Sequence, residues 1–149
     1  MKIAHFIFFL IVFNYSNTLV SQEVFEKEYG SFEEFLNEQN KKISKIQKDI
    51  SREDVLEIMG NSIIVKIPKT GEIKELNQLF KQPEFIDDKH PRAKNNFFVL
   101  WFFSTPKDQN GIISKSECTP VVIKNNVVIG KGQQFYFTHM KKNLLPVLK

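Results

Sequence analysis

Few residues in this sequence could carry nucleophilic chemistry. Cys118 is the single cysteine, and nucleophilic catalysis would need a histidine beside it, or beside a serine, in the folded chain. After residue 21 the sequence contains two histidines, His90 in a segment next to a proline and His139 near the C-terminal end. Either could meet Cys118 in space, which leaves a thiol-dependent enzyme or redox protein as one alternative. No local signature supports it, and the favoured interpretation is that Cys118 packs as a small hydrophobic residue beside Thr119.

Metal binding has even less support. Asp87, Asp88 and His90 have side chains of the ligand type and lie close together in the sequence. A calcium loop, however, requires alternating oxygen donors and a distal glutamate, which this spacing lacks. A single cysteine also excludes every multi-cysteine metal site and any intrachain disulfide. The segment is better interpreted as a solvated acidic turn. We therefore expect no catalytic residue, no cofactor and no metal ligand in this chain.

Phosphate and nucleic-acid binding are also disfavoured. Gly130-Lys131-Gly132 is too short for a phosphate loop, and we expect it to follow a strand with no helix after it. The run from 97 to 103, Phe-Phe-Val-Leu-Trp-Phe-Phe, contains no basic residue, whereas base-stacking surfaces combine aromatic residues with positive charge. The net charge of +4 is mild and is not clustered. We therefore expect no nucleic-acid partner.

The first 21 residues resemble an export signal. Lys2 precedes an unbroken apolar run, residues 6–13, and polar residues follow from Asn14. Eight helical residues span only about 12 Å, far less than the roughly 30 Å hydrocarbon core of a bilayer. The pattern predicts a secretory signal peptide over residues 1–21. Cleavage after Ser21 is preferred, with retention of the segment as a weak anchor as the alternative.

The remaining residues, 22–149, are predicted to form one domain. This length buries a core but is too short for two ordinary domains. A hydrophobic fraction of 42% and a charged fraction of 26% exclude a disordered chain and a multi-span membrane protein. No cysteine lies near the predicted cleavage point, so we expect an exported periplasmic or envelope protein that is not a lipoprotein. No transmembrane span is expected in the mature chain.

Helices are predicted in the first half of the domain. Ser31 and Glu34 form a capping-box pattern, and the apolar residues that follow keep to one face, which predicts a helix over 32–48. Ser51 is an N-cap for a second short helix, with acidic residues in its first turn and Gly60 at the position of a left-handed C-cap.

Strands dominate the second half. A β-branched run predicts a strand over 63–67, and the apolar run predicts a strand over 97–103 with both faces buried or one unusually apolar. Residues 105–116 are typical of a hairpin connection, and Asn125-Asn126 of a tight turn. The other expectations are a short helix over 72–80, a surface loop over 81–96, strands at 121–123, 127–130 and 134–137, and a loosely packed tail at 144–148.

Two segments resemble a known family. The helix from 50 to 60, Ile-Ser-Arg-Glu-Asp-Val-Leu-Glu-Ile-Met-Gly, and the strand from 99 to 103, Val-Leu-Trp-Phe-Phe, are similar to the SmpA/OmlA (BamE-like) family of outer-membrane assembly proteins. The strings Asp108-Gln109-Asn110-Gly111, Glu117-Cys118-Thr119-Pro120 with its apolar triplet, and the 128–132 segment are closer to a related family of uncharacterised small bacterial envelope proteins. The lipid-attachment cysteine of the BamE-like proteins is absent, and the 63–96 segment is longer than their usual link.

The resemblance implies an α+β fold. Two N-terminal helices would pack on a small antiparallel sheet of about three strands, with an inserted strand, helix and loop over 63–96. It implies no catalytic residue. It implies instead a non-catalytic protein-binding or assembly module with envelope protein partners, acting through the sheet face, an exposed strand edge or the 81–96 loop. An inhibitor of an envelope or secreted enzyme is a further alternative with the same fold.

Overall fold

The computed structural model describes residues 23–71, 75–87, 97–107 and 111–141. The predicted signal peptide, the tail at 144–148 and the candidate ligands Asp88 and His90 lie outside these ranges. The described chain has mixed α and β structure, so the predicted α+β class is confirmed. The expectation of one sheet of about three strands was wrong, because the strands form two sheets, of three and four strands.

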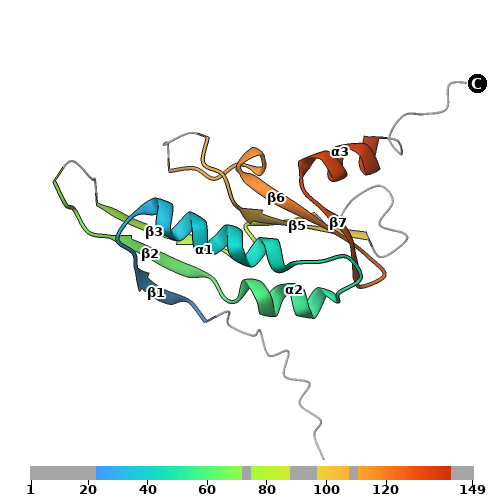
Figure 1. Cartoon of the computed structure of the whole chain (residues 1–149), viewed down its shortest axis with the longest axis horizontal. Coiled ribbons are helices and arrows are strands. Elements are labelled where there is room, and N and C mark those ends of the chain that lie inside the picture. Colours follow the sequence, from blue (N-terminus) through green and yellow to red (C-terminus); the bar gives the residue numbers. More distant parts are fainter. Residues whose placement is uncertain (1–22, 72–74, 88–96, 108–110, 142–149) are drawn as a thin grey trace, which may run out of the picture.

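The first sheet has the strand order β1-β2-β3 (Figure 1). Its strands are β1 (Phe25–Glu28), β2 (Ile63–Ile67) and β3 (Leu76–Phe80). β1 runs parallel to β2, and β3 runs antiparallel to β2. The strand at 63–67 is thus confirmed, whereas the predicted helix over 72–80 was wrong in the described part. Pairing with β2 overrides the four-residue spacing of Leu76 and Phe80, which fits a helix and a strand equally well.

The second sheet is antiparallel throughout, in the order β4-β5-β6-β7. It comprises β4 (Phe85–Asp87), β5 (Phe97–Phe103), β6 (Cys118–Lys124) and β7 (Val127–Lys131). The predicted strands at 97–103, 121–123 and 127–130 are confirmed, as is the hairpin connection before β6, which ends in the single turn η2 (Lys115–Glu117). Asn125 and Asn126 both have positive φ, at 50° and 66°, as a two-residue hairpin turn requires. The prediction of a loop over 81–96 was wrong at 85–87, where the chain forms β4.

The two N-terminal helices begin at the predicted caps. In α1 (Phe32–Lys45) the Ser31 hydroxyl accepts from the Glu34 N–H, but the Glu34 carboxylate accepts from Gly30 N–H and not from Ser31, so the box is only half formed. α1 ends three residues earlier than predicted, because Ile46 turns to an extended conformation that buries its side chain.

The second helix, α2 (Arg52–Met59), has the complete capping box between Ser51 and Asp54. Gly60 ends it with φ 78° and ψ −163°. The positive φ fits the prediction, but the ψ is not that of a left-handed cap. This conformation is essentially restricted to glycine.

A helix after β7 was not expected. α3 (Gln133–Lys141) follows β7 directly and packs on β6 and β7, so the predicted strand at 134–137 was wrong. Gly132 allows the turn with φ 91°, and the Tyr136 N–H donates to the Gly132 carbonyl at the start of the helix. His139 lies three and four residues after Tyr136 and Phe135, so the three side chains project from neighbouring positions of the helix. His139 stacks on Phe135 and on Phe97 of β5, and Tyr136 packs on Trp101 of β5.

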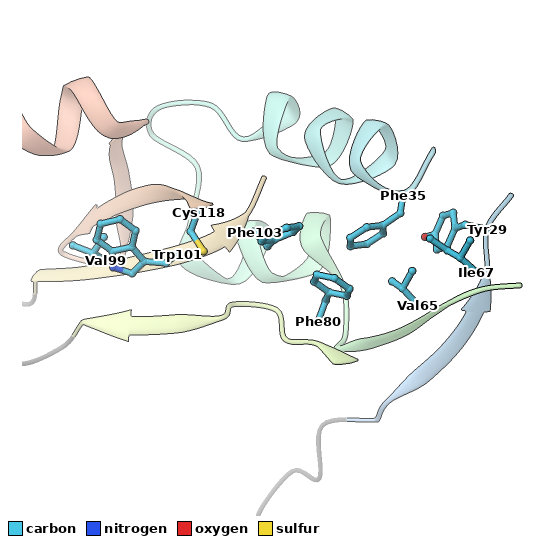
Figure 2. Close-up of a cluster of buried hydrophobic side chains, with 9 residues drawn as sticks. All are labelled: Tyr29, Phe35, Val65, Ile67, Phe80, Val99, Trp101, Phe103 and Cys118. Atoms are coloured by element: carbon cyan, nitrogen blue, oxygen red, sulfur yellow. The ribbon is translucent and has the colours of Figure 1, made fainter. Parts of the chain in front are cut away.

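The core forms two clusters that share β5. Val99, Trp101 and Phe103 belong to the first, with side chains of α1 and the first sheet, while Leu100 and Phe102 belong to the second. β5 is therefore buried on both faces, as its sequence suggested. Figure 2 shows the rings of Phe35, Phe80 and Phe103 gathered in the first cluster. The ring centroids of Phe35 and Phe80 are 4.6 Å apart, and those of Phe80 and Phe103 are 5.0 Å apart. The second cluster packs α2 and the end of α1 on the second sheet.

Candidate functional site

Strand β1 forms an open edge of the first sheet. Figure 1 shows it on the outer side of β2, away from β3. The Phe25 N–H donates to the Ser62 carbonyl (3.1 Å) and the Tyr29 N–H to the Lys66 carbonyl (2.9 Å). In a parallel ladder, alternate residues point their backbone groups to the same neighbour. The N–H and C=O groups of Glu26 and Glu28 therefore point away from β2, toward the open edge.

The side chains of β1 are exposed along its whole length. Of the strands in the described ranges, β1 alone has every residue exposed. Phe25 is 53% exposed and Val24, just before the strand, is 49% exposed. Exposed apolar residues next to open backbone groups are the elements that a strand-binding surface needs.

The charges of β1 are divided between its two faces. Lys27 faces α1, where it forms an ion pair with Glu38 and lies 4.6 Å from the centroid of the Tyr29 ring. The hydrogen bond to Glu38 raises the pKa of Lys27, although burial acts in the opposite direction. Burial also opposes ionisation of Glu38, but the hydrogen bond from Lys27 keeps the pKa of Glu38 below its usual value. On the other face, Glu26 pairs with Lys66 of β2.

The outer edge of β7, by contrast, is partly covered. The linker between α1 and α2 pairs with it: the Val128 N–H donates to the Ile50 carbonyl (2.9 Å), and the Asp49 N–H to the Val128 carbonyl (2.8 Å). The Arg52 N–H donates to the Asn126 carbonyl (3.0 Å). The backbone thus covers part of the β7 edge, whereas among the described residues nothing pairs with the outer edge of β1.

Cys118 is buried and held away from the described histidine. Its side chain is 2% exposed, and its S–H donates to the Ser114 carbonyl at 3.4 Å. Burial raises the pKa of the Cys118 thiol to about 12, with the nearby Glu84 and Glu117 adding to the shift.

Cys118 pairs with Phe103 at one end of β5, and His139 stacks on Phe97 at the other end. A seven-residue strand spans roughly 20 Å, so the structure does not bring the thiol and the imidazole together.

Asp87 takes part in a network within the protein. Its carboxylate accepts from the indole N–H of Trp101 (2.9 Å) and from the ammonium of Lys115 (2.6 and 2.8 Å). That ammonium also lies 5.3 Å from the centroid of the Trp101 ring. These contacts tie β4 and β5 to the η2 turn. Among the described residues, no group of three or more His, Cys, Asp or Glu side chains is arranged to hold a metal ion.

The segment Gly130-Lys131-Gly132 differs from the prediction, because a helix does follow it. Lys131, however, binds the C-terminal end of α1, where its ammonium donates to the carbonyls of Ile43, Ser44 and Ile46. An open cavity of about 420 Å³ lies between the end of α1 and β7, beside Phe135. Since all three protons of the Lys131 ammonium have acceptors, this lysine has none left to give a ligand in the cavity.

Strand β1 was not predicted from the sequence. Its residues, Phe-Glu-Lys-Glu, lack the β-branched enrichment of a strand. The available signal was the pair of apolar residues where the strand begins, Val24 just before it and Phe25 as its first residue. Among the helices that the structure describes, none is long and apolar enough to span a membrane.

Comparison with known protein families gives a match over most of the chain. A family model described as "Protein of unknown function (DUF3192)" matches residues 18–138. No curated protein and no solved structure gives a significant match to the chain.

Proposed function

Because the chain belongs to the DUF3192 family of proteins of unknown function, we propose its role from its own residues: a non-catalytic protein-binding or assembly module of the bacterial cell envelope. The observation that carries the proposal is the open edge of β1, with its exposed side chains and outward-pointing backbone groups. An added strand gains main-chain hydrogen bonds at such an edge.

Two further features support a binding role over a thiol enzyme. The Cys118 thiol is buried and its pKa is raised to about 12, so almost none of it is the nucleophilic thiolate at neutral pH. Asp87, the described member of the candidate metal ligands, is engaged by Trp101 and Lys115. The Cys118 thiol and the Asp87 carboxylate thus form contacts within the folded chain.

The envelope location rests on the sequence. The basic start, the short apolar run and the polar residues after it favour export, with a mature chain beginning at Gln22 and without a lipid anchor. The likeness of α2 and β5 to the SmpA/OmlA family favours the same compartment. The mass of the protein recovered from cells tests this part, because removal of residues 1–21 shortens the chain by a known amount.

Site-specific photocrosslinking tests the binding role. A photoreactive amino acid replaces Glu26 at the open edge of β1, and in a matched variant it replaces Glu57, an exposed residue of α2. In cells that produce the full chain, we expect a protein adduct of defined mass from position 26 and none from position 57.

A second variant shows whether the adduct depends on the strand edge. Glu28→Pro removes an N–H that points outward while the bonds from β1 to β2 remain, which edge strands tolerate. Glu28→Ala keeps that N–H and is the matched control. We expect the proline to abolish the adduct from position 26 and the alanine to retain it. Equal adducts from positions 26 and 57, or an adduct that survives Glu28→Pro, would contradict the proposal.

A further inference from the structure

The charges on β1 restrict what can pair with it. We propose that the open edge of β1 binds an extended segment of a partner protein that carries lysine or arginine at alternate positions. This inference rests on the proposed binding function and adds the chemistry of the partner. It concerns Glu26 and Glu28, which supply both the outward backbone groups and the negative charge of the edge.

The backbone groups of β1 provide the first part of a binding surface. Glu26 and Glu28 each present one N–H and one C=O toward the open side, so a partner strand can form up to four main-chain hydrogen bonds. These bonds carry no sequence preference. The side chains opposite one another on the paired strands must provide it.

Glu26 and Glu28 lie on the same face of the sheet. Glu26 aligns with Ile64 of β2 and Glu28 with Lys66, on the face opposite to α1. Two residues apart in a strand, their side chains are spaced by roughly 7 Å, the spacing of alternate residues in any added strand. Lys66 can balance one of the two carboxylates, which leaves net negative charge on the edge of a chain whose net charge is +4. Alternate basic residues in the partner would face this charge directly.

The other face of β1 accepts a different side chain. Lys27 is already paired with Glu38, so it leaves little positive charge for a partner. Phe25 lies on the same face and is half exposed. An apolar residue between the basic residues of the partner would cover the Phe25 ring. The favoured segment therefore alternates basic and apolar residues.

A second copy of the chain fits this edge poorly. When two copies pair their β1 edges about a twofold axis, residues on one face of the sheet oppose residues on that same face. The two registers that overlap most of β1 place Glu26 opposite Glu26, or Glu26 opposite Glu28, of the other copy. Like charges directly opposite are destabilising. The charge pattern thus selects a basic strand over self-association.

Defined peptides test the inference on the full mature chain. The probes are a nine-residue peptide that alternates lysine and valine and the same peptide with glutamate in place of lysine. Fluorescence anisotropy gives the two affinities, and NMR hydrogen exchange follows the amides of Glu26 and Glu28. At a peptide concentration about ten times its Kd, we expect the lysine peptide to slow exchange of these two amides about tenfold. The glutamate peptide should leave them unchanged.

Charge variants separate the side-chain contribution from the backbone. In the double variant Glu26→Gln and Glu28→Gln, the backbone groups remain and the charge is lost. Since exposed ion pairs contribute weakly, we expect the affinity for the lysine peptide to fall about threefold to tenfold. Glu57→Gln, on α2, is the matched control and should leave the affinity unchanged.

The outcomes distinguish this inference from the proposed function. Equal binding of the lysine and glutamate peptides, exchange slowed elsewhere than at Glu26 and Glu28, or unchanged affinity in the double variant would overturn the basic partner. If the adduct from position 26 still forms in cells, the binding function stands and only the partner chemistry falls.

Discussion

The ammonium group of Lys131 lies 2.6 Å from the carbonyl oxygen of Ile46. The same ammonium donates to Ile43 (2.8 Å) and Ser44 (3.0 Å), so a residue of β7 caps the C-terminal end of α1. Terminal helix carbonyls lack partners within the helix and carry partial negative charge, which a cation there stabilises. Burial lowers the pKa of Lys131, and the three acceptors are the compensation for placing its charge there.

Lys131→Met should therefore destabilise the protein. It keeps most of the apolar stem but removes the ammonium from all three carbonyls, of which that of Ile43 still accepts from the Ile46 N–H. Hydrogen bonds to charged groups contribute about 1.5–3 kcal/mol. We expect a loss of about 1–3 kcal/mol in the free energy of unfolding, measured by urea denaturation. Lys124→Met, at an exposed position of β6, is the control and should change stability by less than about 0.5 kcal/mol. Equal losses in both variants would contradict the capping role.

Gly130 is required by the ring of Phe135. A Cβ at position 130 would lie 2.5 Å from three atoms of that ring, closer than real contacts allow. Gly130→Ala should push α3 away from the sheet and cost about 1–3 kcal/mol, as overpacking does. Tyr136 of α3 packs on Trp101 with centroids 4.9 Å apart, so the fluorescence of this single tryptophan should shift to the red.

The control for Gly130→Ala is a second substitution that makes room. In a double-mutant cycle, Phe135→Leu removes the ring that the new methyl group meets, and the two changes should be less than additive. Additive losses of stability would show that the 130–135 contact is not the cause.

Local signals explain which elements the sequence could predict. α2 was predicted because Ser51, Asp54 and Gly60 act within the helix itself, and β5 because its run of seven apolar residues has few alternatives. α3 was missed because its aromatic residues suggest a strand, while its position depends on Gly132 and on the space above Gly130. Neither dependence is visible without the sheet.

The candidate site was less predictable than the fold. β1 contains Glu26, Lys27 and Glu28, and its strand conformation results from pairing with β2, more than thirty residues away. An open edge is a property of the whole sheet: the linker at 49–52 covers β7, and nothing in the described ranges pairs with the outer side of β1. Binding through an exposed strand edge was expected from the sequence, without an indication of which strand, and the structure shows that β1 has an open edge among the described residues.

Glu84 should make stability depend on pH. Burial raises the pKa of its carboxyl to about 7 from the usual 4.5, against the opposing effects of the Lys81 N–H and the Lys81 charge. Between these two pH values the folded chain holds the proton more tightly than the unfolded chain. The contribution of Glu84 to stability is therefore fully present below about 4.5 and is lost as the pH rises through about 7.

Glu84→Gln removes this dependence while keeping an oxygen that can accept from the Lys81 N–H. The difference in free energy of unfolding between the variant and the parent protein should rise in favour of the variant from about pH 4.5 and level off above about pH 7. Urea denaturation at a series of pH values measures it, with Glu57→Gln as the exposed control. A difference that stays constant across this range would contradict the raised pKa.

Cys118 should be inert in the native protein. With its pKa raised to about 12 from 9.0, the thiolate fraction at a given pH below 9 falls on the order of a thousandfold, and burial restricts access further. Alkylation at pH 8, followed by mass spectrometry, should be slow for the folded chain and fast in urea. Cys118→Ser should keep the adduct from position 26 and lose only a modest amount of stability, since a hydroxyl can still donate to the Ser114 carbonyl. Rapid labelling of the folded chain, together with loss of the adduct in Cys118→Ser, would instead favour a thiol-dependent activity.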